Sequence, residues 1–547
     1  MNMQDAVDKL LKEHPNVLLN PDRKKMIADS YERREAIIAE SGALATWTPP
    51  ESTGRSPKDT VIVKRPESEA NIDWDSPNNI PITEETFDLA FEDIIKVFEQ
   101  DDKLYVTDRV LGADSRYALP TRTVANFALT ALFTDNMFRP VPSDIDRSIF
   151  TDKPFTLLVA PYNKLNPERY VGKVRKLPNG ETSNMIVAMD FDRNVGIVFG
   201  SAYGGSVKKL MFTVMNYLLP GEGILPLHCS ANEGEHKDSA LLLGLSGTGK
   251  TSLSADPRRA LLGDDEHGWS ENGIANFENG CYAKMININP KKESEIYNAV
   301  MHKDDYLNHG SIVENAMVYP DGVFDYDDER FTPNSRASYP LRYLQNIKPA
   351  STAGHPKTIL FLTADANGVL PPISRLSREG AMFWFLMGYT SKLAGTETGI
   401  VDPVSTFSRF FGQPFMPRNP DVYAEMLGDK MVEHGTTVYL VNTGWSGGPY
   451  GIGARIDIDL TRAMVQAALT GALKEVEYSR DSIFKVNIPK SCPEVPDEIL
   501  FPKNTWEDKA AYDERAKKLA LDFKASFKKQ YGNKNIDPKV IAECPEP

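Results

Sequence analysis

The stretch SALLLGLSGTGKTS, residues 239–252, joins an apolar run to a glycine-rich turn. Residues 244–251 satisfy the pattern G-x-x-x-x-G-K-[ST], in which a strand leads into a loop whose successive backbone N–H groups wrap a phosphate. Lys250 would reach the β and γ oxygens, and the Thr251 hydroxyl would join a Mg²⁺ shell. The alternative interpretation is a flexible Gly/Ser turn. We predict a nucleotide-binding loop made of Gly244, Leu245, Ser246, Gly247, Thr248, Gly249, Lys250 and Thr251.

Just beyond this loop, a second apolar run ends in paired carboxylates. LLGDDEHGW, residues 261–269, resembles the acidic strand end that holds a metal beside such a loop, with Asp264 and Asp265 as the ligands. A capped turn is the alternative for this pair. Only ten residues separate Lys250 from Leu261, whereas a parallel crossover normally needs about a dozen or more. The spacing therefore predicts a compact, atypical P-loop domain.

On the N-terminal side of the loop, His228 follows another apolar run in LPLHCSAN. A lone histidine in this position is more often a buried, hydrogen-bonded residue than a metal ligand. Together with Asp265, however, it would offer an imidazole nitrogen and a carboxylate, a set that suits Mn²⁺ better than a thiolate metal. The neighbouring Cys229 is interpreted as a small packing residue.

Basic residues recur in three glycine-rich or polar turns farther away. Lys208 and Lys209 end YGGSVKK; they are typical of a solvated surface pair, but near a metal one of them would have to lose its proton. Arg55 in TGRSPKD and Arg336 in NSRAS could each clamp a carboxylate or phosphate through two hydrogen bonds. Taken singly, such segments are mostly surface loops.

The composition limits the class of protein. The 547 residues include 62 basic and 76 acidic side chains, a net charge of −14, which argues against nucleic acid as a partner. The four cysteines form no C-x-x-C pair, which argues against a disulfide framework or a structural zinc site. No apolar run approaches the roughly 20 residues that span a bilayer, and no secretory signal is apparent. We expect a cytoplasmic protein without a membrane partner.

Along the chain, the patterns indicate a mixed α/β protein of two lobes. Residues 1–40 have the apolar spacing of two surface helices, and short β-branched runs alternate with helical segments up to about residue 220. YLLPGEGILP, residues 217–226, has turn residues on both sides of a strand start. We place the lobe boundary there, giving an N-terminal lobe of residues 1–223 and a C-terminal lobe of residues 224–547.

Taken together, eight motifs resemble the ATP-dependent phosphoenolpyruvate carboxykinases in order and spacing over roughly residues 35–530. The motifs are TGRSPKD (53–59), YGGSVKK (203–209), HCSAN (228–232), GLSGTGKTS (244–252), GDDEHGW (263–269), FENGCYAK (277–284), NSRASYP (334–340) and NTGW (442–445). The loop GLSGTGKT does not resemble the cysteine-bearing phosphate loop of the GTP-dependent branch. Asn279 stands where the family commonly has glycine, and WTPPES before Thr53 departs locally from the pattern.

The resemblance implies a two-lobed α/β fold with the active site in the cleft between a substrate-binding N-terminal lobe and a P-loop nucleotide-binding C-terminal lobe. It implies conversion of oxaloacetate and ATP to phosphoenolpyruvate, CO₂ and ADP, through an enolate and direct in-line phosphoryl transfer. The reaction would serve gluconeogenesis or run in the reverse, anaplerotic direction. The oligomeric state stays open.

Carried over residue by residue, the resemblance also implies roles for individual side chains. The Mn²⁺ ligands would be Lys209, held neutral, His228 and Asp265, and Thr251 would bind the Mg²⁺ that accompanies ATP. The substrate and departing CO₂ would contact Arg55, Tyr203 and Lys208. The transferring phosphoryl group would contact Ser246, Lys250 and Arg336. The nucleoside would contact Lys284, Glu293, Arg455 and Thr461.

Two other classes of function are compatible with the loop alone. A P-loop kinase acting on a protein hydroxyl would need a base for the hydroxyl proton and would not need Arg55 or the segment 203–209. A non-catalytic nucleotide-sensing module would bind ATP without turnover. ATP consumption with oxaloacetate as the only acceptor separates both from a carboxykinase.

Overall fold

A computed structural model describes residues 2–245, 247–254, 256–392 and 403–547 of the chain. The chain forms two compact units: unit 1 comprises Met1–Leu218 and Asn276–Pro349, and unit 2 comprises Leu219–Ala275 and Ala350–Pro547. The chain first passes from unit 1 to unit 2 after Leu218, close to the boundary expected at residue 223. Residues 276–349, which the sequence analysis assigns to the C-terminal lobe, belong instead to unit 1, because their strands pair with a strand from the N-terminal part of the chain.

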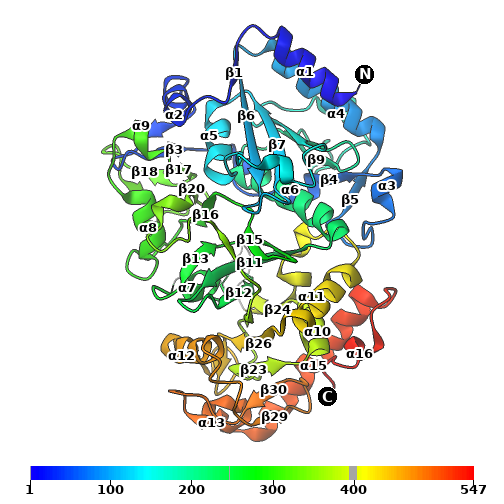
Figure 1. The fold of residues 1–547 in the computed structure, drawn as a ribbon, viewed down its shortest axis with the longest axis vertical. Coiled ribbons are helices and arrows are strands. Elements are labelled where there is room, and N and C mark those ends of the chain that lie inside the picture. The colour runs from blue at the N-terminus through cyan, green and yellow to red at the C-terminus, as the bar shows by residue number, and fades with distance from the viewer. Residues whose placement is uncertain (1, 246, 255, 393–402) are drawn as a thin grey trace. The chain divides into compact units, whose positions relative to one another are not determined.

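Unit 1 contains an eight-stranded mixed sheet in the order β1-β6-β7-β8-β10-β9-β4-β5 (Figure 1). Its strands are β1 (Val17–Leu19), β4 (Thr60–Val63), β5 (Ile80–Ile82), β6 (Leu104–Leu111), β7 (Leu119–Ala125), β8 (Phe155–Ala160), β9 (Ile186–Asp190) and β10 (Val195–Phe199). Helix α4 (Glu84–Gln100) places Phe87, Ile94 and Phe98 in the same apolar core as this sheet. It does so because its apolar residues recur every three or four positions, on one face of the helix.

A second, five-stranded sheet joins distant parts of unit 1 in the order β16-β20-β17-β3-β2. Its strands are β2 (Ile37–Ile38), β3 (Leu44–Thr46), β16 (Gly280–Lys284), β17 (Ile312–Glu314) and β20 (Arg336–Pro340), and β18 (Met317–Val318) pairs with β19 (Phe324–Asp325) outside it. The other helices of unit 1 are α1 (Met3–Glu13), α2 (Arg23–Glu32), α3 (Pro66–Glu69), α5 (Ala128–Met137), α6 (Gly204–Leu218), α8 (Ser294–Met301) and α9 (Tyr306–His309).

Unit 2 is built on an eleven-stranded sheet in the order β21-β15-β14-β11-β12-β22-β26-β23-β30-β29, with β13 also paired to β11. The strands are β11 (Leu225–Glu233), β12 (Ser239–Gly244), β13 (Ala260–Gly263), β14 (Glu266–Ser270), β15 (Gly273–Asn276), β21 (Thr352–Ala353), β22 (Thr358–Thr363), β23 (Ile373–Leu376), β26 (Thr437–Asn442), β29 (Tyr478–Arg480) and β30 (Asn487–Pro489). Strand β12 is antiparallel to β11 and parallel to β22. The chain therefore passes from β12 to β13 across β11.

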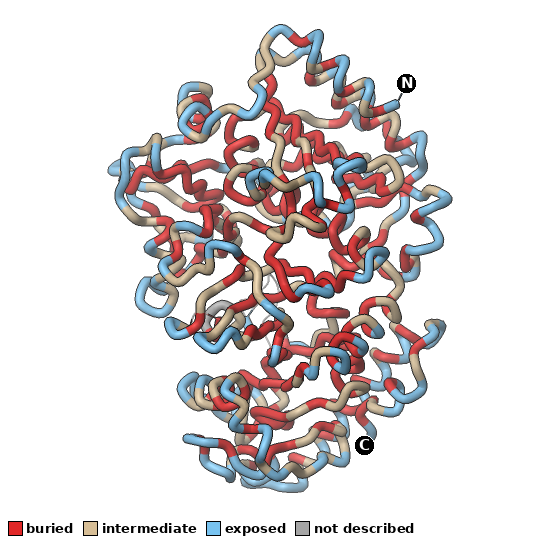
Figure 2. The backbone as a smooth tube through the Cα atoms, in the orientation of Figure 1, coloured by how far each residue is buried: buried red, intermediate tan, exposed pale blue. Residues whose placement is uncertain are grey.

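Helices and two small hairpins complete unit 2. The hairpins are β24 (Tyr389–Lys392) with β25 (Val404–Phe407) and β27 (Trp445–Ser446) with β28 (Ala454–Arg455). The helices are α7 (Lys250–Ser254), α10 (Arg378–Met387), α11 (Pro420–His434), α12 (Ile458–Leu469), α13 (Asp497–Leu500), α14 (Pro502–Thr505), α15 (Lys509–Tyr531) and α16 (Pro538–Ile541). In Figure 2 the strands are mainly buried, whereas helix α1 alternates buried and exposed residues.

The structure confirms the mixed α/β class and the principal predicted elements. The two expected N-terminal helices are α1 and α2. Among the residues that the structure describes, no helix combines the length and apolar character needed to cross a membrane.

Candidate functional site

The predicted phosphate loop lies in unit 2, between the buried strand β12 and helix α7. Gly247 and Gly249 have φ angles of 84° and 89°, a left-handed conformation that residues with side chains rarely adopt. A Cβ on Gly244 would lie 2.5 Å from Thr248 Oγ1, so this position also requires glycine. Ser246 and the side chain of Thr251 lie outside the described residues. The glycines permit a tight turn; contact of the loop with phosphate stays a prediction.

Two side chains from a later part of the sequence of unit 2 donate hydrogen bonds to carbonyl groups of this loop. Thr443 Oγ1 donates a hydrogen bond to the Thr248 carbonyl at 3.0 Å. Arg455 Nη2 donates to the Gly247 carbonyl at 3.1 Å, and its Nε donates to the Thr443 carbonyl at 2.9 Å. These bonds fix the Gly247 and Thr248 carbonyls, and the Thr248 N–H donates to the Leu245 carbonyl at 3.3 Å within the loop. Arg455, predicted to contact the nucleoside, thus also supports the loop itself.

His228, Lys250 and Asp265 converge on one carboxylate oxygen in unit 2. His228 Nε2 lies 2.9 Å from Asp265 Oδ1, and Lys250 Nζ lies 3.2 Å from the same oxygen. His228 projects from β11, and Asp265 lies in the break between β13 and β14. Both of these strands pair with β11, which is why residues 37 positions apart in the sequence meet here.

The hydrogen bonds of His228 fit a cation ligand. Its Nδ1 lies 2.6 Å from the Phe411 carbonyl, an acceptor, so this nitrogen carries the proton. When the ring is protonated, Nε2 donates to Asp265 Oδ1; when it is neutral, Nε2 has a lone pair that faces the lone pairs of that oxygen. Two such atoms are stabilised by a cation, and a metal-binding histidine characteristically donates its other N–H to a carbonyl in this way. The donor set therefore fits a divalent cation, with the Lys250 ammonium beside it.

Cys229 and Asp264, which adjoin His228 and Asp265 in the sequence, and Thr461 of helix α12 are each held within unit 2. The Cys229 thiol is buried and its pKa is raised by that burial, consistent with a packing residue. The carbonyl of Asp264, the other predicted acidic ligand, accepts a hydrogen bond from Ser230 Oγ at 2.7 Å. Thr461, predicted to contact the nucleoside, is buried in α12, where its hydroxyl donates to the Asp457 carbonyl at 3.0 Å.

The remaining predicted site residues belong to unit 1, and several lie on or beside helix α6. Tyr203 directly precedes this helix, which bears Lys208 and Lys209. The glycines of YGGSVKK are required by close packing, because a Cβ on Gly205 would come within 2.3 Å of the Tyr203 ring. Lys208 Nζ forms a buried ion pair of 2.9 Å with Glu278.

Lys209 belongs to unit 1, whereas His228 and Asp265 belong to unit 2. That the three share one cation, and that Lys209 is neutral, stay predictions. Lys209 Nζ lies 4.6 Å from the centre of the Phe212 ring.

Strand β20 places Arg336 beside Asn334, which in turn contacts Tyr203. Arg336 Nε donates to Asn334 Oδ1 at 2.9 Å, and the Asn334 amide lies 3.4 Å from the Tyr203 hydroxyl. The same amide donates to the Thr53 carbonyl at 2.9 Å, which ties the loop bearing Arg55 to this segment. The structure thus brings three separate predicted motifs of unit 1 together.

Two predicted nucleoside contacts also lie in unit 1. Lys284 is opposite Arg336 on the neighbouring strand β16, and burial together with the Arg336 charge lowers its pKa. Glu293 precedes helix α8 and accepts the Asn289 N–H at 3.1 Å.

Sequence reasoning missed five residues that join these groups. Thr443, Glu278, Tyr282 and Asn334 all lie within motifs that it quoted, so a signal was present. Glu314 was not singled out; its only signal is a carboxylate at the end of the apolar run SIVEN, residues 311–315.

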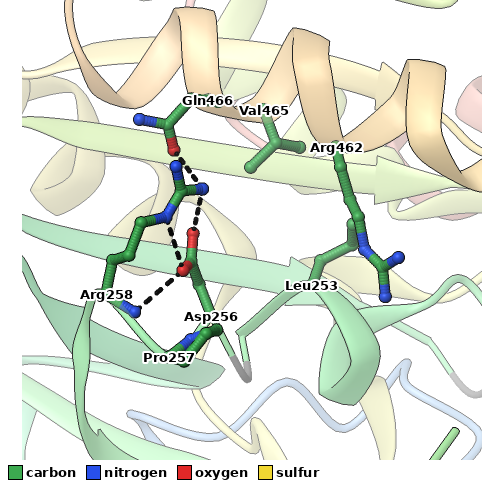
Figure 3. Close-up of a pocket in the computed structure, with 7 residues that line it drawn as sticks. All are labelled: Leu253, Asp256, Pro257, Arg258, Arg462, Val465 and Gln466. Carbon is green, nitrogen blue, oxygen red and sulfur yellow. Dashed lines mark hydrogen bonds and ion pairs between the residues drawn. The ribbon is translucent and has the colours of Figure 1, made fainter.

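A separate pocket lies beside helix α7 in unit 2 (Figure 3). Its lining residues are Leu253, Asp256, Pro257, Arg258, Arg462, Val465 and Gln466. Arg258 is held by Asp256 at 2.8 Å and by Gln466 at 3.1 Å, whereas Arg462 extends from α12 on the opposite side of the view. Among the described residues, no predicted site residue lines this pocket.

Comparison with known proteins finds relatives along nearly the whole chain. The sequence model of a family described as phosphoenolpyruvate carboxykinase matches residues 15–498. A protein of Geobacillus kaustophilus named phosphoenolpyruvate carboxykinase (ATP) is 46% identical over 542 residues, 98% of each chain. Proteins of the same name from Caldanaerobacter subterraneus subsp. tengcongensis and Thermus thermophilus are 47% and 46% identical over 517 and 522 residues. Each alignment covers 94% of this chain and 95% of the relative.

Proposed function

Because the chain belongs to the ATP-dependent phosphoenolpyruvate carboxykinase family, we propose that it converts oxaloacetate and ATP to phosphoenolpyruvate, CO₂ and ADP. The observation that carries the proposal beyond family membership is the convergence of His228 and Lys250 on Asp265 Oδ1, within 3.2 Å. It joins a cation ligand set to the lysine of the phosphate loop in one unit. A phosphoryl transfer assisted by a divalent cation needs these groups together.

The chemistry proceeds in two balanced steps. Cleavage of the C–C bond to the departing carboxylate releases CO₂ and leaves the electron pair on an enolate. The enolate oxygen then attacks the γ-phosphorus in line, and the bond to the leaving β-phosphate oxygen breaks to give ADP. Cationic groups positioned before the reaction stabilise the oxygens on which negative charge develops.

Different residues of this chain bind the substrate and the phosphates. Arg55, Tyr203 and Lys208 bind and orient oxaloacetate, and Glu278 holds the Lys208 ammonium in its buried position. Lys250 and Arg336 spread the charge of the transferring phosphoryl group. The backbone of residues 244–251 holds the phosphates.

Metal binding is part of the proposal. His228 and Asp265, with Lys209, would hold Mn²⁺, Thr251 would hold the Mg²⁺ that accompanies ATP, and Asp264 is a further candidate metal ligand. A divalent cation at the first site supplies electrostatic stabilisation of the enolate oxygen. The Phe411 carbonyl keeps the His228 ring oriented with its Nε2 lone pair toward Asp265.

A coupled assay for phosphoenolpyruvate formation tests the proposal. Oxaloacetate is supplied with ATP or with GTP, each with and without Mn²⁺. We expect product with ATP, much less with GTP, and stimulation by Mn²⁺. ATP hydrolysis without phosphoenolpyruvate, or binding of ATP without any turnover, would contradict it and favour a kinase or a nucleotide sensor.

A further inference from the structure

Glu314 is a buried carboxyl in a row of charged groups across the second sheet of unit 1. Its side chain is almost fully buried, with 5% of the residue exposed. In the register of the sheet, Glu314 is opposite Arg336, and Arg336 is opposite Lys284 on the next strand. Residues directly opposite one another on neighbouring strands have their side chains on one face. Glu314 therefore lies beside Arg336, and Lys284 lies one strand farther along the same face.

Glu314 accepts hydrogen bonds from two different segments. The Tyr282 hydroxyl donates to Oε2, and the backbone N–H of Gly204, the first residue of helix α6, donates to Oε1 at 3.2 Å. Burial raises the pKa of Glu314 to about 7, although both donors and Arg336 act against this rise. An acceptor at a helix N-terminus also stabilises the partial positive charge of the helix end.

The packing around these bonds leaves little freedom. A Cβ on Gly204 would lie 2.8 Å from Glu314 Oε1 and 2.6 Å from the Phe133 ring, so the start of α6 lies directly against the carboxyl. The Tyr282 ring meets Phe133 edge-on, with centres 5.5 Å apart, and meets Tyr203 at 5.6 Å. Tyr282 is thus wedged between the residue that precedes α6 and the apolar core.

A second set of contacts links Arg336 to Tyr282 and Tyr203. The Arg336 guanidinium lies 5.9 Å from the centre of the Tyr282 ring, within cation–π range. Through Asn334, Arg336 is also linked to the Tyr203 hydroxyl. The proposed substrate-binding tyrosine and the proposed phosphoryl-binding arginine are therefore joined through Tyr282, Asn334 and Glu314.

We propose that Glu314 and Tyr282 form a positioning pair that holds the N-terminus of α6, with Tyr203 and Lys208, in register with Arg336. The inference rests on the proposed function for its catalytic consequence, but the positioning itself is a property of unit 1. Neither residue touches the reacting atoms. Each acts through the groups it orients, for which a displacement of about 1 Å can cost about 100-fold in rate.

Two conservative variants test the pair. Tyr282→Phe removes only the hydroxyl, and Glu314→Gln removes the charge and replaces one of the two acceptor oxygens by an NH₂ group. The matched control is Glu35→Gln, because Glu35 is also a buried carboxyl that accepts an N–H from the first turn of a helix, that of Leu129 in α5 at 2.8 Å. Thermal melts first establish that each variant is folded.

We expect the variants to lose turnover and apparent affinity for oxaloacetate but not affinity for ATP. Each variant at the pair lowers kcat about tenfold and raises the oxaloacetate KM, while ATP affinity stays within about twofold. The double variant loses little more than the worse single one, since the two side chains act as a unit. Glu35→Gln retains kcat and both KM values.

Hydrogen exchange provides a readout that needs no activity. Amides in peptides covering residues 203–212 should exchange several-fold faster in both variants than in the wild type or in Glu35→Gln. Unchanged exchange in both variants overturns the positioning pair, and so does an additive double variant. If the wild type forms no phosphoenolpyruvate, the proposed function fails, and the exchange rates alone decide the positioning.

Discussion

At the scale of single residues, Asp265 of the acidic pair after β13 has a defined chemical setting. Asp265 Oδ1 lies 2.9 Å from His228 Nε2 and 3.2 Å from Lys250 Nζ. Asp265→Asn halves the acceptor character of the group and removes its charge. A carboxylate that holds a cation is far more sensitive to this change than a solvated one.

We predict that Asp265→Asn lowers phosphoenolpyruvate formation by about 100-fold or more, while ATP binding partly survives through the loop backbone. The coupled assay and calorimetric titration with ATP measure the two effects. Asp459→Asn, which removes an exposed carboxylate of the same unit, serves as the control. Near-normal turnover of Asp265→Asn would refute the cation assignment.

A second residue, His309, bears on stability through its protonation. The ring is buried, its Nδ1 accepts the Ser311 N–H at 3.3 Å, and its Nε2 donates to the His302 carbonyl at 2.9 Å. Both nitrogens are therefore satisfied in the neutral form. Burial, with a smaller contribution from His302, lowers the pKa of His309 from 6.5 to about 4.

A lowered histidine pKa means that the unfolded chain binds more protons than the folded chain between these values. The stability contributed by neutral His309 is present above pH 6.5 and is lost as the pH falls toward 4. We predict that His309→Gln reduces the fall in unfolding free energy between pH 6.5 and pH 5, by up to about 1.4 kcal/mol per pH unit. Urea unfolding at several pH values measures the slope; equal slopes in both proteins would contradict the assignment.

At the scale of elements, periodicity predicted the helices and strands well. Helix α4 and strand β8 carry the apolar pattern expected for their type, and both lie in the region where β-branched runs and helical segments were predicted to alternate. The run ALLGDDEHGW was treated as one strand end, but the structure divides it into β13 and β14. The break places the acidic pair between two strands that share one partner, which no local pattern encodes.

The phosphate loop shows a second dependence between elements. Thr443 follows β26 and donates to the loop carbonyl of Thr248, nearly 200 residues earlier in the chain, and also lies 3.2 Å from the Thr363 carbonyl. The residue is buried, so loss of its hydroxyl leaves acceptors without this donor.

We predict that Thr443→Val weakens ATP binding about tenfold, corresponding to about 1.4 kcal/mol, while the oxaloacetate KM changes little. The control is Thr436→Val, because Thr436 is also buried in unit 2 and donates to the Pro356 carbonyl at 2.7 Å, away from the loop. Titration with ATP compares the two. Equal affinities would show that the loop does not depend on Thr443.

At the scale of the whole molecule, the discontinuous units decide which parts of the chain can fold together. Strand β17 pairs with β3 of the N-terminal part, and Lys208 is buried against Glu278. A fragment that ends at residue 223 keeps Lys208 but loses its partner, and an unpaired buried charge costs about 3–5 kcal/mol.

We therefore predict that residues 1–223 alone do not unfold cooperatively, whereas residues 1–218 joined through a flexible linker to 276–349 do. Near-UV circular dichroism and thermal melts distinguish the two. A cooperative transition in the shorter fragment would contradict the division of the chain into these units. That the active site lies in a cleft between the lobes stays a prediction.

The sequence by itself determined the class of elements, the glycine-rich loop and the family, because these depend on local periodicity and on motifs that stay contiguous along the chain. Only the tertiary structure decided that residues 276–349 return to unit 1, that Arg455 and Thr443 support the loop, and that Glu314 joins Tyr282 to helix α6. These facts depend on strand pairing and on burial between segments far apart in the sequence. The role of a carboxyl in an apolar run cannot be predicted from the neighbouring sequence, because its hydrogen-bond donors come from distant segments of the chain.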